Sequence, residues 1–163
     1  MQLNILQIIK AWMVFQVGAF ALLVGINNVT DYGSNFAFVQ HVMSMDTTFE
    51  GNSLMWRAID SAPLHHAFYA LIILGELLCG CICMYAAFRL WRVRNDLAAF
   101  KQAKPLAAVG LTIGITLWFS GFMTVGAEWF LMWQSESWNG QPAAIRFITM
   151  LFFVLLFLYV PEE

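Results

Sequence analysis

The sequence predicts an all-α, polytopic membrane protein, because it is rich in apolar residues, poor in charge and divided into long apolar segments. Of its 163 residues, 61% are hydrophobic and only 11% are charged, and the mean hydropathy is +0.70. Soluble domains are about 45–50% apolar and about 25% charged. The composition therefore excludes a soluble globular domain, a disordered chain and a nucleic-acid-binding protein. The first predicted partner is the lipid bilayer.

Four segments are suited to form transmembrane helices, each of which needs about 20 mostly apolar residues. They lie within a single membrane domain, 1–163, and cover residues 5–29, 63–90, 106–132 and 142–160. Pro63, Pro105 and Pro142 stand at or just before the start of a segment. Because proline is favoured in the first turn of a helix, we expect each of them to open its helix. The predicted architecture is a four-helix bundle.

The basic residues predict how the bundle is oriented. Six of the eight lysines and arginines fall on one side of the predicted bundle: Lys10, Arg89, Arg92, Arg94, Lys101 and Lys104. Only Arg57 and Arg146 fall on the other side. Since cytoplasmic loops carry an excess of Lys and Arg, we predict that both termini are cytoplasmic. The loop formed by residues 30–62 then faces outward.

The outer loop carries helical and aromatic signals. Within residues 35–45, the apolar positions 36, 39, 42 and 43 follow a helical spacing. We therefore predict a short helix that lies on the outer membrane interface. Four tryptophans near the outer helix ends are expected to form an aromatic belt: Trp56, Trp129, Trp133 and Trp138.

Small residues predict where helices approach closely. They recur every seven residues in the first segment (Ala11, Gly18, Gly25) and in the third (Ala107, Gly114, Gly121). Small residues allow close backbone approach between membrane helices. We expect these seams to lie within one chain. The three cysteines, Cys79, Cys81 and Cys83, do not have Cys-x-x-Cys spacing and are interpreted as small packing residues of the second helix.

Glu76 is the sharpest single signal, because it lies near the middle of the second helix. An ionised carboxylate there costs several kcal/mol, so we expect it to be neutral or paired and to face the bundle. Helical spacing places it on one stripe of that helix: His65, Tyr69, Glu76, Gly80 and Cys83. The polar residues expected at its depth are Gln16, Thr116 and Ser120. This intramembrane set predicts either a proton, cation or ligand site or a bond that only fixes packing.

A second polar set gathers at the predicted outer face. Its members are Asn28, Asp31, Asn35, His41, Asp46, Arg57, His65, Glu128, Trp129, Trp133, Gln134, Trp138 and Asn139. Such polarity at the mouth of a short bundle predicts a shaped outer surface or pocket. A metal site would need two or more of the histidines and carboxylates to converge, and no metal is predicted.

Several of these residues belong to segments that resemble a known family. The segments read NNVTDYGSN (27–35), FVQHVMSMDT (38–47), WRAI (56–59), EWF (128–130), MWQS (132–135) and WNGQ (138–141), together with Glu76. They resemble the bacterial predicted small integral membrane proteins, the family called domain of unknown function 2165. The resemblance spans nearly the whole chain. It implies a four-helix protein of the bacterial inner (cytoplasmic) membrane and carries no activity with it.

Three functions stay open from the sequence. A non-catalytic accessory or partner-binding subunit that acts through its outer (periplasmic) face is favoured, because the chain is small and shows no complete catalytic set. Its partner would be another membrane protein or a second copy of the chain. The alternatives are an oligomeric channel or transporter that uses the Glu76 stripe, and a quinone-binding redox subunit. An enzyme is not favoured, and no cofactor is identified.

Overall fold

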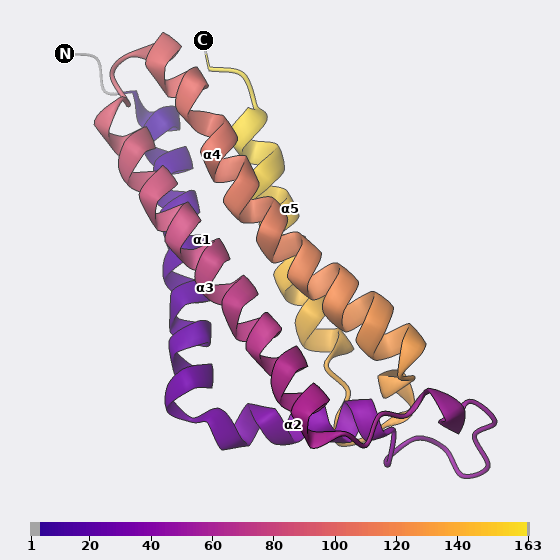
Figure 1. Ribbon diagram of the computed structural model, residues 1–163. Helices are drawn as coiled ribbons and strands as arrows, with labels where there is room; N and C mark the ends of the chain where they lie inside the picture. The colour runs from indigo at the N-terminus through magenta and orange to yellow at the C-terminus, as the bar shows by residue number, and fades with distance from the viewer. Residues whose placement is uncertain (1–3, 163) are drawn as a thin grey trace.

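The protein is a bundle of long helices, described by a computed structural model over residues 4–162 (Figure 1). These residues contain no β-strand, and four of their helices are long and apolar enough to cross a membrane, which confirms the predicted fold class. The four are α1 (Ile5–Thr30), α3 (Ala62–Arg92), the joined helix α4 (Leu97–Thr116) and η2 (Leu117–Trp129), and α5 (Gln141–Tyr159).

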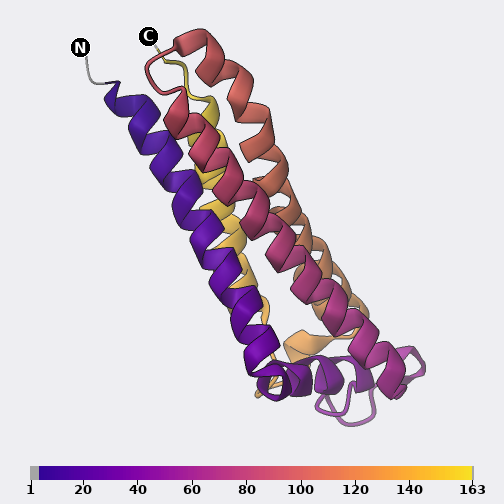
Figure 2. The same ribbon diagram turned by 60° about the vertical axis from the view of Figure 1, so that its left-hand side comes forward.

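The two ends of the bundle differ in build. The first turn of α1 and the last turn of α5 lie together at one end, called here the terminal end (Figures 1 and 2). The opposite end, called the loop end, carries α2 (Tyr32–Ser44) and the short 3-10 helices η1 (Met55–Arg57) and η3 (Met132–Gln134). Helix α2 runs crosswise under the bundle (Figure 2). The first loop therefore holds a helix, and its position at a membrane interface stays a prediction.

The third membrane helix begins earlier than the sequence predicts. It starts at Leu97 instead of residue 106, and Pro105 lies inside α4 instead of opening it. The true start is set by Asp96, whose Oδ1 accepts a 3.0 Å hydrogen bond from the backbone N–H of Ala99. A carboxylate in that position caps a helix N-terminus. Charged residues around 101–104 lower the local hydropathy and so conceal this extension.

Segment η2 is a π-helix, in which the backbone bonds run from residue i to i+5. At its end the N–H of Phe130 donates to the carbonyl of Val125 over 3.0 Å. π-helical turns are rare, usually single, and often found at functional sites. Here the segment covers the 13 residues closest to the loop end of that helix.

The packing of α1 on α3 is the most extensive in the bundle, and small residues permit it. A Cβ added at Gly18 would lie 2.8 Å from the backbone nitrogen of Met84. One added at Gly80 would lie 2.8 Å from the backbone nitrogen of Leu22. The predicted intramolecular seam along α1 is thus confirmed, since Ala11, Gly18 and Gly25 are all buried.

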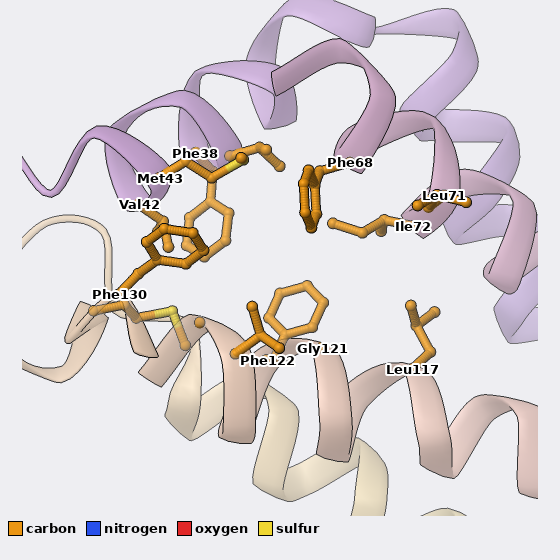
Figure 3. A pocket seen from close by; sticks show the side chains of 14 residues that line it. Phe38, Val42, Met43, Phe68, Leu71, Ile72, Leu117, Gly121, Phe122 and Phe130 are labelled. Carbon is orange, nitrogen blue, oxygen red and sulfur yellow. The ribbon is translucent and has the colours of Figure 1, made fainter. Parts of the chain in front are cut away.

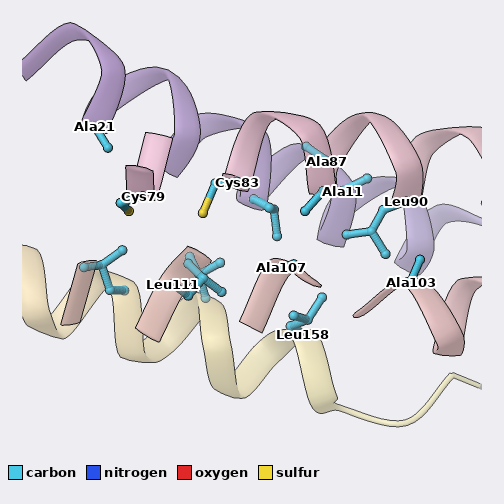
Figure 4. Close-up of a cluster of buried hydrophobic side chains, with 14 of the residues drawn as sticks. Ala11, Ala21, Cys79, Cys83, Ala87, Leu90, Ala103, Ala107, Leu111 and Leu158 are labelled. Carbon is cyan, nitrogen blue, oxygen red and sulfur yellow. The ribbon is translucent and has the colours of Figure 1, made fainter. Parts of the chain in front are cut away.

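Cysteines serve the same purpose between α3 and α4 (Figure 4). The Sγ of Cys83 lies 2.7 Å from where a Gly110 Cβ would stand, and that of Cys79 lies 2.9 Å from the corresponding point on Gly114. Both thiols are buried, whereas Cys81 is exposed. Gly121 departs from the predicted seam, because nothing lies within 4 Å of its added Cβ. Open space therefore lies beside Gly121, and the close packing on α3 does not continue to that level.

Candidate functional site

A hydrogen-bonded polar track leads from α2 into the bundle and ends at Glu76. Asn35 Nδ2 donates to Asn28 Oδ1 over 2.6 Å, and Asn28 Nδ2 donates to Glu76 Oε2 over 2.7 Å. Asn35 is exposed, whereas Asn28 and Glu76 are 5% and 3% exposed. The hydroxyl of Tyr69 donates to the carbonyl of Asn28 over 3.2 Å. The track therefore joins the surface of the loop end to a carboxyl group inside the bundle.

Glu76 faces the interior of the bundle as predicted, but its hydrogen-bond partner is not one of the predicted residues. All five residues of the stripe from His65 to Cys83 are buried, as expected. Gln16, Thr116 and Ser120, however, are exposed on the outside of the bundle. Glu76 lies instead beside the last turns of α1, where an added Gly25 Cβ would be 3.4 Å from the Glu76 Cβ. Its partner comes from the residues that the sequence places at the outer face.

Glu76 lines a cavity, called here the Glu76 chamber, with a volume of about 220 Å³. Helices α1, α2, α3, η2 and α5 all contribute to its walls. The lining consists of Val24, Asn28, Asn35, Phe38, Val39, Tyr69, Ile72, Glu76, Trp118, Phe122, Gly140, Ala143, Ala144 and Phe147. Of the two carboxyl oxygens of Glu76, Oε2 is hydrogen-bonded, whereas Oε1 has no hydrogen-bond partner among the described residues.

An aromatic cluster lies between α2 and the first turns of α3, and one of its members, Tyr69, lines the chamber. Tyr32 packs edge-on against Tyr69 with ring centroids 4.6 Å apart, and Phe36 stacks on His66 at 4.2 Å. The Tyr32 hydroxyl is hydrogen-bonded to Nδ1 of His66 over 2.8 Å. Of these residues, Tyr69 was predicted only as a member of the stripe. The cluster fixes α2 against the first turns of α3.

A second cavity adjoins the chamber and opens between α3 and η2 (Figure 3). This α3–η2 groove has a volume of about 190 Å³ and shares Phe38, Val39, Ile72 and Phe122 with the chamber. Every lining residue is apolar or glycine. In Figure 3, Phe68 and Ile72 of α3 face Gly121 and Phe122 of η2 across it. The π-helix thus forms one wall of both cavities.

The loop end is held together around Arg57. Its guanidinium lies over the rings of Trp129 at 4.9 Å and Trp56 at 5.4 Å. Nη1 donates to the carbonyls of Glu128 and Trp129, each over 3.4 Å. The carboxylate of Glu128 is exposed and takes no part in this contact. Arg57 therefore ties the first loop to the end of η2 through the backbone.

The remaining loop-end residues make local contacts that hold the connections. His41 is paired with Asp46 over 2.7 Å and stacks on Trp138 at 4.5 Å. Four further predicted residues make side-chain contacts with the loops: Gln134 with Phe49 N, His65 with Ile59 O, Asn139 with Gln141 N, and Trp133 with the Phe49 ring. The carboxylate of Asp31 accepts from the Ser34 hydroxyl.

The outer-face prediction therefore divides into two places. Asn28 and Asn35 belong to the Glu76 track, whereas the other members lie at the loop end, where most of their side chains make the contacts given above. Within residues 4–162, no group of three or more His, Cys, Asp or Glu side chains is arranged to hold a metal ion.

The sequence prediction missed a buried ionic cluster at the terminal end. Lys10 Nζ lies 2.5 Å from Glu162 Oε1, and Lys104 Nζ lies 2.7 Å from Glu162 Oε2. All three side chains are almost completely buried. Burial alone would raise the pKa of Glu162, but the hydrogen bonds from the two lysines outweigh it and hold that pKa below its ordinary value. Two lysines interpreted as topology signals thus anchor the end of the chain.

Fold and site together define a polytopic α-helical integral membrane protein with a mostly apolar chamber inside its bundle that contains one carboxyl group. The family model for predicted small integral membrane proteins, domain of unknown function 2165, matches residues 6–161, so the chain belongs to that family. The resemblance seen in the sequence is thereby confirmed. Comparison with curated proteins and with solved structures finds no match to the chain.

Proposed function

We propose that this protein is a non-catalytic membrane protein that binds a small amphipathic molecule in the Glu76 chamber. The observation that carries the proposal is the buried carboxyl group of Glu76, which faces a cavity of about 220 Å³ with one oxygen free. Ligand sites are concave, mostly apolar, and contain a few well-placed polar groups. The chamber has this composition, and its polar track reaches the surface at Asn35.

The alternative of a conduction path through one chain has less support. On the terminal side of Glu76, the buried residues of α3 are Cys79, Gly80, Cys83, Ala86, Ala87 and Leu90. None of them is an aspartate, glutamate, histidine, lysine or arginine, and they pack closely on α1 and α4. The buried face of the described part of α3 therefore offers no line of acidic or basic side chains between Glu76 and the Glu162 cluster.

The proposal is tested by purifying the full chain from its own membranes and measuring bound small molecules by native mass spectrometry. Ala143 lines the chamber, so Ala143→Leu should fill it. Ala98→Leu, at an exposed position on α4, is the matched control. We expect a small amphipathic adduct on the wild type and on the control, and its loss in Ala143→Leu. Equal occupancy in all three proteins, or no specific adduct on the wild type, would overturn the proposal.

A second candidate function is the docking of another membrane protein at the loop end. Phe49, Met55, Trp56, Trp129 and Trp133 are exposed there, and Trp56 is 68% exposed. Exposed apolar patches of this kind mark interaction sites. The same loops carry exposed acidic residues, among them Asp46, Glu50 and Glu136. The fitting partner is a membrane protein whose extramembrane rim is basic.

Site-specific photo-crosslinking in intact membranes tests this docking. A crosslinker at position 56 should give a protein adduct that weakens with Glu50→Lys, because the charge reversal repels a basic rim. A crosslinker at Leu156, exposed on the apolar surface of α5, is the control and should give lipid adducts. Lipid adducts alone at both positions would exclude the docking function. In either case we propose that the loop end is periplasmic in a bacterial inner membrane and that the termini are cytoplasmic.

A further inference from the structure

We infer that the ligand of the Glu76 chamber is a cationic amphipath: an ammonium head against Glu76 and a single hydrocarbon chain in the α3–η2 groove. This inference rests on the proposed ligand-binding function and specifies the chemistry of the ligand. Three observations support it: the composition of the chamber, the charge of the loop end, and the continuity of chamber and groove.

The chamber has the composition of a cation site. Its described lining includes one carboxyl group and no lysine, arginine or histidine. Five aromatic side chains contribute to the walls: Phe38, Tyr69, Trp118, Phe122 and Phe147. Aromatic faces attract ammonium groups, and the attraction grows when the cation is desolvated. A buried carboxylate without a basic partner is costly, and a bound ammonium would supply the missing charge.

The approach to the chamber also favours a cation. The polar track enters from the loop end through exposed Asn35. The exposed carboxylates of that end are Asp31, Asp46, Glu50, Asp60, Glu128 and Glu136, against the two guanidinium groups of Arg57 and Arg146. A surface of one predominant sign raises the local concentration of the opposite charge. An anionic head would meet repulsion both at this end and at Glu76.

The adjoining groove fits a hydrocarbon chain. It shares four wall residues with the chamber, and all of its lining is apolar or glycine. Each cavity alone, at about 190 and 220 Å³, is smaller than an ordinary ligand pocket, whereas the two together reach the usual range of about 300–1,000 Å³. Phe68, Leu71 and Val125 of its lining are exposed, so the groove opens on the apolar surface of the bundle, where a hydrocarbon chain can enter from the bilayer.

Gly121 makes the groove testable. Its added Cβ meets nothing within 4 Å, so Gly121→Leu should place a side chain in the groove without a clash. Val109→Leu, at an exposed position on α4, adds one methylene elsewhere and is the control. Glu76→Gln removes the charge while keeping size and hydrogen bonding. Each variant should elute and unfold as the wild type does, which separates a binding defect from misfolding.

The experiment is calorimetric titration of the full chain in dodecyl maltoside with four probes. Dodecyltrimethylammonium carries both recognised parts, 1-dodecanol lacks the charge, and butyltrimethylammonium lacks the long chain. Lysophosphatidylcholine distinguishes a lipid headgroup from a free amphipathic amine as the natural source of the ammonium. We expect Glu76→Gln to weaken dodecyltrimethylammonium about tenfold and to leave dodecanol unchanged, because a quaternary ammonium has no N–H and is attracted to the carboxylate by charge alone. Gly121→Leu should weaken dodecyltrimethylammonium about tenfold and leave butyltrimethylammonium unchanged, since it removes only chain burial.

Two results would refute the inference that the ligand has a cationic head group against Glu76. One is equal affinity of the wild type for dodecanol and dodecyltrimethylammonium, and the other is unchanged binding of dodecyltrimethylammonium in Glu76→Gln. Unchanged binding of dodecyltrimethylammonium in Gly121→Leu would show that the hydrocarbon chain of the ligand does not lie in the α3–η2 groove. In each of these results the chamber still binds an amphipath, so the proposed function stands. If no probe binds the wild type and the native protein carries no adduct, the proposed function fails together with this inference.

Discussion

Asn28 on α1 donates a 2.7 Å hydrogen bond to Glu76 on α3, and both residues are buried. The bond joins the two helices that pack most extensively, close to the point where α1 ends at Thr30. It also connects the interior to the loop end, because Asn28 accepts from Asn35 of α2. A substitution at Glu76 therefore alters a hydrogen-bonded network that joins α1, α2 and α3.

This bond predicts a difference between two substitutions at Glu76. Glu76→Leu leaves the Asn28 amide without its acceptor and should lower the free energy of unfolding by about 1–3 kcal/mol. Glu76→Gln keeps an oxygen acceptor and should change stability by less than about 0.5 kcal/mol. Thermal unfolding in detergent measures both. Equal destabilisation by the two variants would mean that the charge itself holds the fold.

The Glu162 cluster predicts a strong effect from a residue near the end of the chain. Glu162→Gln leaves Lys10 and Lys104 buried without a counter-charge. Breaking a buried ion pair by removing one partner costs about 3–5 kcal/mol. We expect a loss of that order in the free energy of unfolding, whereas Glu136→Gln, at an exposed loop-end position, should change little. A silent Glu162→Gln would show that the cluster is not formed.

The same carboxylate predicts acid sensitivity. The pKa of Glu162 is lower in the folded protein than in an unfolded chain, so its contribution is fully present above the unfolded pKa. It is lost as the pH falls below the ordinary glutamate pKa and through the lower pKa of the folded protein. The wild type should therefore lose stability in that acid range more steeply than Glu162→Gln does. Parallel pH profiles for the two proteins would contradict this assignment.

For Glu76, the sequence allows its orientation to be predicted but not its hydrogen-bond partner. Its inward direction follows from the cost of a carboxylate in lipid, which needs no knowledge of neighbours. The hydrogen-bond partner of Glu76 depends on where α1 ends and on the register in which α1 packs against α3. Hydropathy determines neither of these. For that reason Asn28 is predicted at the outer face and Gln16 inside, whereas the structure places Asn28 inside and Gln16 outside.

Two other features were beyond the reach of sequence patterns for physical reasons. A π-helix differs from an α-helix by a shift of one residue in the hydrogen-bond pairing, and the apolar composition of η2 suits both. The Glu162 cluster joins residues more than 50 positions apart, and a lysine near a helix end is typical of a topology signal. Only the packing of α1, α4 and α5 brings these charges together.

Substitution by alanine is expected to affect stability differently at two glycines, Gly80 and Gly121. An added Cβ at Gly80 would stand 2.8 Å from the backbone nitrogen of Leu22, which cannot move without shifting α1. Gly80→Ala should therefore cost about 1–3 kcal/mol of stability by overpacking. Gly121→Ala meets open space and should be neutral. Comparison of the two unfolding temperatures in one detergent tests the pair, and a tolerated Gly80→Ala would refute the close α1–α3 seam.

The six-to-two division of basic residues predicts sidedness in the cell. Reporter fusions at either terminus should be active only when the reporter works in the cytoplasm, and a reporter inserted in residues 45–54 should show the opposite preference. Since Lys10 and Lys104 are also structural, the test is best repeated with the exposed residues Arg89 and Arg92 changed to glutamine. Termini active only in the periplasm would reverse the orientation of the chamber.

Arg57 predicts how firmly the first loop is held. Its guanidinium contacts two tryptophan rings, and its Nε is buried without a partner among the described residues. Arg57→Gln removes both cation–π contacts, each of about 0.5–2 kcal/mol, and loosens the loop from the end of η2. Limited proteolysis should then cut residues 45–61 several-fold faster, whereas Arg92→Gln, exposed at the terminal end, should leave the rate unchanged. Equal cleavage of the two variants would show that the loop is held by its other contacts, such as the Thr47–Ser135 hydrogen bond of 2.8 Å.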